Sequence, residues 1–271
     1  MRENCIRWHA RRGSSIASDR RFAVFDLETN GFRAASAVSA SSIVFTGDGR
    51  ILDFFNRFYY PEERPDPRTE SVHGLTPGRI GHFRREEEYG PHFLEDWPSL
   101  AAFWDGWNPE GIVVHNLSFD ISFLPPEAVR GRKWWCSMRG LTEFCRIPGS
   151  PERGGRWKWP KLGEASARVK EDLAPTGATA ETEELLGPPL AHFGLSDCFE
   201  LYGIFSRVWN AIPGQVRFRA ASAPFLPPRR QPYLLPSPLR DRFTAERLAY
   251  AARLAAASGS REREEKLLGL A

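Results

Sequence analysis

The chain has 271 residues, of which 41% are hydrophobic and 26% charged, and its formal net charge is +3. This length allows one domain of about 200 residues with a full core, plus tails. The nearly balanced charge does not mark the whole molecule as a polyanion binder. No stretch reaches the roughly 18 uninterrupted apolar residues of a membrane span, so we expect no membrane association.

The first 21 residues are strongly basic, with six arginines against Glu3 and Asp19. Two interpretations stay open for this arm: phosphate contact, or a solvated leader. It contains no apolar core of about 7–15 residues, so we expect no secretory signal. The four cysteines lack Cys-x-x-Cys spacing, which argues against zinc and disulfides. We therefore expect a cytoplasmic protein.

The rest of the chain is organised around residues 22–32, where an apolar run presents Asp26 and Glu28 and then turns at Asn30 and Gly31. Such a run, closed by Asn-Gly, predicts a strand that ends in a turn. Alternate residues of a strand share a face, so both carboxylates project together, roughly 6.5–7 Å apart. That geometry suits a metal ligand pair, although two solvated acids would follow the same pattern.

Two segments rich in β-branched and aromatic residues follow, at 37–45 and 51–60, and flank a Gly-Asp-Gly-Arg turn. They predict a hairpin. With the first strand they form an antiparallel meander that carries Asp26 and Glu28 at the end of its first strand. We expect an exposed connection at 79–91 and an amphipathic helix at 94–107, whose tryptophans pack into the core.

A short apolar run at 111–116 predicts a central strand covered on both faces. Helical spacing begins directly after it, so Asp120 falls in the first helical turn at the carboxyl edge of the sheet, where α/β proteins place their sites. An acid there also meets the helix dipole favourably, so capping is the alternative role.

A third stretch places His192 five residues before Asp197, at the entry to a helix predicted from Ser196 onward. Another histidine, His73, precedes a glycine at a chain reversal and could lean over a neighbouring cleft. The loop at 149–163 interleaves cations with tryptophans, which suits single-stranded nucleic acid as well as an ordinary solvated loop. Its members are Arg153, Arg156, Trp157, Lys158, Trp159 and Lys161.

In chain order, these stretches resemble the motifs of the DnaQ-like 3′→5′ exonucleases of the DEDDh type, a family that includes the proofreading epsilon subunit of bacterial DNA polymerase III. The first motif matches at 25–32, the second at 115–120, and the third at His192 with Asp197. The resemblance covers residues 21–210 and implies an RNase H-like α/β fold, with a mixed five-stranded sheet flanked by helices. Two departures are Gly194, where the family usually has alanine, and a long acidic stretch before His192.

The resemblance implies the chemistry of the site. Asp26, Glu28, Asp120 and Asp197 would bind two Mg²⁺ or Mn²⁺ ions, and His192 would act as general base. Two such ions, about 3.5–4 Å apart, serve in-line phosphodiester hydrolysis, which would release nucleoside 5′-monophosphates from a 3′ end. Substrate contacts are expected from Thr29, Phe32, His73 and Asn116.

These expectations define four segments: a basic arm at 1–20, an exonuclease domain at 21–212, a proline-rich linker at 213–240 and a helical tail at 241–271. The tail suggests a polymerase or other protein partner, by analogy with proofreading subunits. Single-stranded DNA is the favoured substrate. Trimming of RNA 3′ ends, or a catalytically silent nucleic-acid-binding module on the same fold, are the alternatives.

Overall fold

A computed structural model describes residues 19–85, 87–150 and 156–271 of the chain. Most of the basic arm and the whole of Arg153 therefore lie outside the described residues. Five strands form one mixed sheet in the order β3-β2-β1-β4-β5. Their bounds are β1 (Arg21–Thr29), β2 (Ala37–Thr46), β3 (Ile51–Phe58), β4 (Ile112–Val114) and β5 (Trp134–Cys136).

The sheet combines the predicted meander with two parallel strands. Strands β1, β2 and β3 pair antiparallel, whereas β4 runs parallel to β1 and to β5. The hairpin between β2 and β3 turns at Gly49, whose φ of +98° is open to glycine without strain. The predicted fold class, a mixed five-stranded sheet flanked by helices in an RNase H-like α/β domain, is confirmed.

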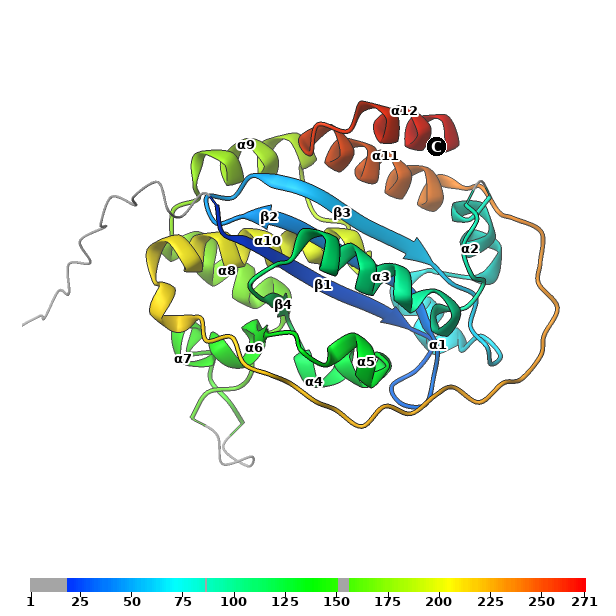
Figure 1. The fold of residues 1–271 in the computed structure, drawn as a ribbon, viewed down its shortest axis with the longest axis horizontal. Helices are drawn as coiled ribbons and strands as arrows, with labels where there is room; N and C mark the ends of the chain where they lie inside the picture. The colour runs from blue at the N-terminus through cyan, green and yellow to red at the C-terminus, as the bar shows by residue number, and fades with distance from the viewer. Residues whose placement is uncertain (1–18, 86, 151–155) are drawn as a thin grey trace, which may run out of the picture.

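Helices cover both faces of this sheet (Figure 1). The first part of the chain supplies α1 (Pro67–His73), α2 (Pro77–Phe83), α3 (Phe93–Trp107), α4 (Leu117–Asp120), the 3₁₀ turn η2 (Ile121–Phe123) and α5 (Pro126–Val129). The rest supplies α6 (Ser137–Gly140), α7 (Thr142–Cys145), α8 (Leu162–Asp172), α9 (Gly177–Leu186), α10 (Gly194–Ala211), η4 (Pro213–Gln215), α11 (Arg242–Ala257) and α12 (Arg261–Leu270).

Alternation along β1 divides the core into two clusters. Phe22 and Val24 face the side of α8, α10 and α11, whereas Ala23, Phe25 and Leu27 face the side of α3 and α5. Trp104 of α3 is buried against Phe25, which confirms the predicted core role of this tryptophan. Because Asp26 and Glu28 continue the series of Phe22 and Val24, both acids lie on the α10 side.

One expected loop is a helix. Residues 79–91 were expected to form an exposed connection, but α2 buries Ile80 and Phe83 in the core. Thr76 caps this helix by accepting a hydrogen bond from the amide of Arg79, and Pro77 occupies its first turn. The charged residues around α2 masked a start signal of capping residue plus proline that the sequence carries.

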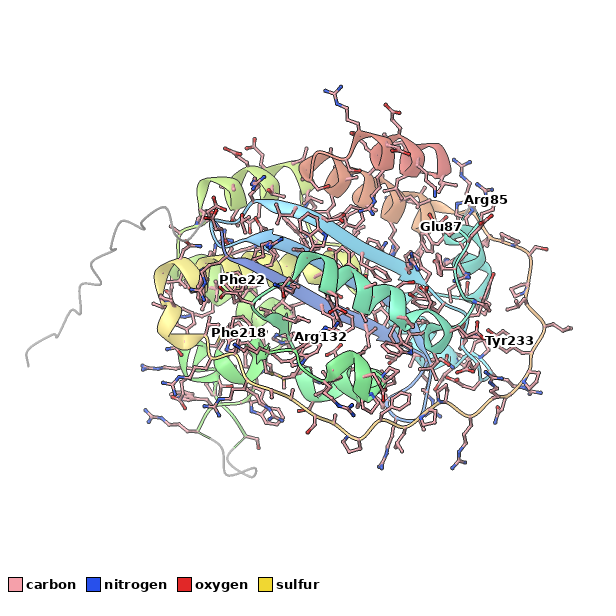
Figure 2. The ribbon with its side chains drawn as sticks, viewed as in Figure 1. Phe22, Arg85, Glu87, Arg132, Phe218 and Tyr233 are labelled. Atoms are coloured by element: carbon pink, nitrogen blue, oxygen red, sulfur yellow. The ribbon has the colours of Figure 1, made fainter. Side chains whose placement is uncertain are left out.

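After α10 the chain crosses back to the sheet before it runs to the tail helices. Phe218 stacks on Phe22 with their ring centroids 5.8 Å apart, and both are labelled in Figure 2. Residues 220–241 contain no helix or strand and follow the surface as an extended segment (Figure 1). The amide of Gln231 donates to Glu62 O, and that of Leu239 to Gly78 O, so this segment is attached along its length.

The predicted tail helix is present as α11, with Asp241 as its capping residue, and α12 follows it. Leu248, Tyr250 and Leu254 of α11 belong to the core cluster on the α10 side. The tail helices therefore complete the core of the sheet domain; the expected four-segment division of the chain stays a prediction. In the described residues no helix is long and apolar enough to cross a membrane.

Candidate active site

Asp26 and Glu28 lie at the carboxyl end of β1, the central strand. Their cross-strand neighbours in β2 are Ser41 and Ser39. Both acids are half-buried. The adjacent serines are small, so the two carboxylates share a recess between β1, β2 and the start of α10.

Asp120 reaches the same end of the sheet from the neighbouring strand. Since β4 runs parallel to β1, the chain leaves both strands at the same edge. It turns directly into α4, whose last residue is Asp120, with 4% of its surface exposed. The side chain therefore points into the domain beside β1 rather than serving a solvated helix terminus.

Asp197 and His192 come from the start of α10. This helix begins at Gly194, two residues before the predicted start, and packs on β1 and β2. His192 precedes it in an exposed loop, with a φ of +54°, a value uncommon for residues other than glycine. One ligand atom each of Glu28, His192 and Asp197 lies within 4.8 Å of the others, so three of the predicted residues form one cluster.

The electrostatics join Asp26 and Asp120 to this cluster. Burial raises the pKa of Asp26 well above its usual value, and the charges of Asp120, Asp197 and Glu28 raise it further. Burial likewise raises the pKa of Glu28 and of Asp120 to about 8, and that of Asp197 to about 7. The four carboxylates thus repel one another, and the positive charge near them does not offset this repulsion.

This donor set fits divalent cations. Carboxylate oxygens are the ligands that Mg²⁺ and Mn²⁺ prefer, and a bound cation would offset the burial and the repulsion that raise these pKa values. Asp26 is central, because all three other acids act on it. His192 is close enough to Glu28 and Asp197 to be a further ligand or a base beside the ions.

Gly194 allows the close approach of α10 to the acids. A Cβ at this position would lie 3.0 Å from Ser41 Oγ and 3.3 Å from Asp26 Oδ2, closer than most such contacts. Gly194, where the resemblance leads us to expect alanine, therefore faces a serine of β2. The Oγ of Ser41 donates to Asn56 Oδ1 at 2.9 Å, which holds it in the recess.

The expected substrate-contact residues occupy different environments. Thr29 is buried, and its hydroxyl donates to Gly31 O at 2.8 Å. Asn116 is exposed directly before α4. Phe32 is 85% exposed, with its ring edge-on to that of Phe119 at a centroid distance of 6.5 Å. Exposed aromatic surface beside the acids is available to stack on a base.

His73 is buried, so it does not overhang a cleft as expected. The amide of Leu75 donates to its Nδ1 at 3.0 Å, which places the proton of the neutral ring on Nε2. Burial, with a smaller contribution from the charge of His192, lowers its pKa to about 4, although the nearby backbone of Thr29 acts against this shift. His73 therefore stands as a neutral ring behind His192; its role in substrate binding stays a prediction.

The basic and aromatic loop lies beside α4 in its described part. The guanidinium group of Arg139 lies over the exposed ring of Trp159, 5.4 Å from its centroid, and donates to Ser118 Oγ at 3.0 Å. His115 contacts Pro160 O through Nε2. These contacts attach the loop to the second motif, which is compatible with either role considered for it.

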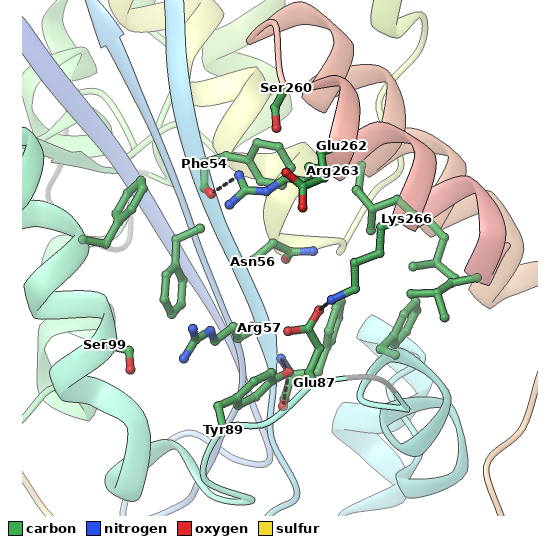
Figure 3. A pocket seen from close by; sticks show the side chains of 18 residues that line it. Phe54, Asn56, Arg57, Glu87, Tyr89, Ser99, Ser260, Glu262, Arg263 and Lys266 are labelled. Carbon is green, nitrogen blue, oxygen red and sulfur yellow. Dashed lines mark hydrogen bonds and ion pairs between the residues drawn. The ribbon is translucent and has the colours of Figure 1, made fainter.

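The acidic stretch before His192 is structural at Glu183. This carboxylate forms two bonds of 2.7 Å with Arg207 of α10, so it binds α9 to α10. A cavity of about 570 Å³ lies elsewhere, between β3, α3 and α12, and none of the predicted site residues lines it. Its cations are paired within it or at its rim, as Lys266 is with Glu87 in Figure 3.

Sequence analysis missed one residue of the site, Arg247 of α11. Its charge lowers the pKa of both Glu28 and Asp197, although it is 50 residues beyond Asp197 in the chain. Nothing in its spacing links it to the three motifs. The regular apolar face of α11 was the available signal, because it required that helix to pack on the domain.

No protein-family model matches the chain, and no curated protein matches it significantly. Solved structures of exonucleases are similar to it. Exonuclease X in complex with 5′ overhanging duplex DNA is 20% identical, over 71% of this chain and 93% of that one, with a TM-score of 0.47. A 3′-exonuclease that recognises a histone mRNA stem-loop is 14% identical, over 71% and 82%, with a TM-score of 0.47.

Exonuclease I from Methylocaldum szegediense is 16% identical, over 72% of this chain but only 42% of that one, with a TM-score of 0.47. All three of these structures are exonucleases. The specific resemblance to an epsilon subunit stays a prediction.

Proposed function

We propose that this protein is a metal-dependent 3′→5′ exonuclease that hydrolyses single-stranded nucleic acid and releases nucleoside 5′-monophosphates. The observation that carries the proposal is the convergence of Asp26, Glu28, Asp120 and Asp197 from three separate elements on one recess, with His192 at its rim. A decayed site would tolerate loss of these charges. Their repulsion costs stability unless cations bind, so retention of all four favours a working metal site.

The proposed roles of the four acids follow from the resemblance to the DEDDh exonucleases. Asp26, Glu28 and Asp197 would hold one ion, and Asp26 with Asp120 would hold a second. Two Mg²⁺ or Mn²⁺ ions supply activation of water and stabilisation of charge on the leaving oxygen. The chain itself places the acids on β1, α4 and α10, whose ends meet at one edge of the sheet.

His192 is proposed as the general base. An imidazole with a pKa near neutrality can accept the proton of the attacking water at physiological pH. The exposed loop leaves its ring free to reach a substrate, whereas the buried His73 lies behind it. Helix α10 begins two residues after His192 and so fixes the end of the loop that carries this residue.

Phe32 is proposed to stack on the terminal base of an unpaired strand. Stacking does not distinguish sugars, and only a contact to the 2′-hydroxyl separates RNA from DNA. The preference for DNA rests on the resemblance to proofreading subunits with a tethered tail. A polymerase or other protein partner of the tail is part of the same proposal.

The test is digestion of matched 5′-labelled single-stranded DNA, single-stranded RNA and a mismatched duplex with Mg²⁺ or Mn²⁺. Release of nucleoside 5′-monophosphate supports the proposal, and faster release from DNA supports the preference. Binding of all three without release over a full metal titration would instead identify a silent nucleic-acid-binding module.

A further inference from the structure

Helix α11 packs directly on the loop that carries His192. Phe193, the next residue, lies between Phe58 of β3 and Tyr250 of α11, at centroid distances of 6.4 and 6.0 Å. Burial raises the pKa of the Tyr250 hydroxyl well above its usual value, and this hydroxyl has no hydrogen-bond partner within the described residues. Helix α11 is thereby part of the wall of the candidate active site.

Arg247 of α11 lies beside the loop that carries His192. Its side chain is 8% exposed, and its Cζ lies 3.2 Å from the ring centroid of Phe243 and 5.4 Å from that of Phe193. Two aromatic rings thus fix the plane of the guanidinium group. A planar cation held in this way is ordered before any ligand arrives, which lowers the entropy cost of binding.

The guanidinium group has unused hydrogen-bonding capacity. Its one hydrogen bond within the described residues is a long contact of 3.4 Å from Nη1 to Phe243 O, and its Nε has none there. Neighbouring arginines differ, because Arg79 pairs with Asp241 at 2.8 Å and Arg242 with Glu246 at 2.6 Å. A buried arginine lacking such a pair is costly unless a ligand completes it.

The required ligand is an anion beside the acid cluster. Arg247 contacts Phe193, which lies between His192 and the first residue of α10, and it forms no ion pair within the described residues. We therefore expect this anion to be a phosphate of the substrate, brought to the neighbouring carboxylates by the cations that they would hold. The guanidinium fork matches two oxygens of one phosphate.

We propose that Arg247 is a substrate-binding residue, which contacts a phosphate of the 3′-terminal nucleotides through its guanidinium fork. The C-terminal helices then contribute directly to nucleic-acid binding, in addition to any partner they recruit. This inference rests on the proposed exonuclease function, since it names the substrate group that reaches the same site.

The experiment measures the affinity of the full chain for fluorescein-labelled oligo(dT) in Ca²⁺, as a function of salt, for the wild type, R247M and R253M. Arg253 is the matched control, because it lies on the same helix with its Cζ 5.5 Å from the ring centroid of Tyr250 rather than beside Phe193. One lost phosphate contact should lower the slope of log Kd against log salt by about 0.7. We expect this change and at least about tenfold weaker binding in R247M, with R253M unchanged.

An unchanged salt slope in R247M, or an equal change in R253M, overturns the inference even if the wild type digests DNA normally. Thermal melting checks the fold of each variant. If R247M unfolds, R247K replaces it: retained charge should keep the slope, and loss of the fork should weaken binding severalfold. Wild-type affinity in R247K would then overturn the inference, whereas absence of binding by the wild type would overturn the proposed function as well.

Discussion

The Oγ of Ser41 lies 3.0 Å from the point where a Cβ on Gly194 would stand, so β2 and the first residue of α10 meet with no room for a methyl group. The same point is 3.3 Å from Asp26 Oδ2. Close approach of the Gly194 backbone to the Ser41 side chain brings Asp197, three residues into the helix, toward the acids of β1. The position of the third motif therefore depends on a small residue at 194.

Gly194→Ala should lower turnover about tenfold, because the added methyl displaces Ser41 and the Asp26 carboxylate by a few tenths of an ångström. Overpacking of this kind costs about 1–3 kcal/mol of stability. The double variant G194A/S41A removes the oxygen in contact and should recover part of the activity, with S41A alone as the control. Wild-type kcat in G194A would show that the site is not this tightly packed.

His192→Ala should reduce kcat strongly, by about 10²–10⁴-fold, as expected for loss of a general base. Affinity for Mn²⁺, measured by calorimetry, should stay nearly unchanged, because four carboxylates remain. The alternative is that His192 binds an ion, since one ligand atom each of Glu28, His192 and Asp197 lies within 4.8 Å of the others. A matching loss of Mn²⁺ affinity would identify His192 as a metal ligand.

The metal-free protein should lose stability as the pH rises. Folding raises the pKa of Glu28 from 4.5 to about 8, and raises those of Asp120 and Asp197 as well. The folded state then holds more protons than the unfolded state between about pH 4.5 and 8, so the free energy of unfolding falls through this window. Thermal melts in EDTA across this range measure the effect.

Added Mg²⁺ should reverse this loss at pH 8, because it binds the ionised acids of the folded state only. The buried Asp120 supplies the control: Asp120→Asn removes one repelling charge and should raise the melting temperature of the metal-free protein at pH 8, but not at pH 5. A melting temperature that does not depend on pH in EDTA would show that folding does not raise the pKa values of these acids.

Phe32→Ala should raise KM for a single strand by about 5- to 150-fold, which corresponds to the loss of about 1–3 kcal/mol of base stacking. Stability should not change, since the ring is 85% exposed. Leu234→Ala is the matched control, because Leu234 is 96% exposed and lies on the segment between α10 and α11. Equal KM values for the wild type and F32A would exclude Phe32 from substrate binding.

The sugar preference has its own measurement. A single 3′-terminal ribonucleotide on a DNA strand adds one 2′-hydroxyl and leaves stacking unchanged. We expect no acceleration, in agreement with a preference for DNA. Clearly faster removal of the terminal ribonucleotide would favour RNA 3′-end trimming.

Local pattern predicted the placement of three of the candidate acids. Strict alternation along β1 put Asp26 and Glu28 on one face, and the switch from strand to helical spacing put Asp120 at the sheet edge. These features depend on neighbouring residues, so sequence reveals them. The burial of His73 and the helix α2 were missed, because charged neighbours suggested a solvated loop around both.

Contacts between distant segments could not be predicted in the same way. Arg247 reaches the acids only because α11 packs against β3 and the loop at Phe193, and Glu183 is structural only because Arg207 lies opposite it. Neither pairing has a periodicity or spacing of its own. Such contacts are fixed by tertiary packing, which a single sequence does not display.

We predict that the site formed by the four carboxylates hydrolyses nucleic acid from its 3′ end. The most direct test digests one single-stranded oligonucleotide, labelled at either its 5′ or its 3′ end, with the wild type and Asp26→Asn in Mg²⁺ or Mn²⁺. The wild type should shorten the 5′-labelled strand stepwise and release the 3′ label at once as a mononucleotide. D26N should show neither activity. Undiminished hydrolysis by D26N, or release of the 5′ label first, would contradict the account.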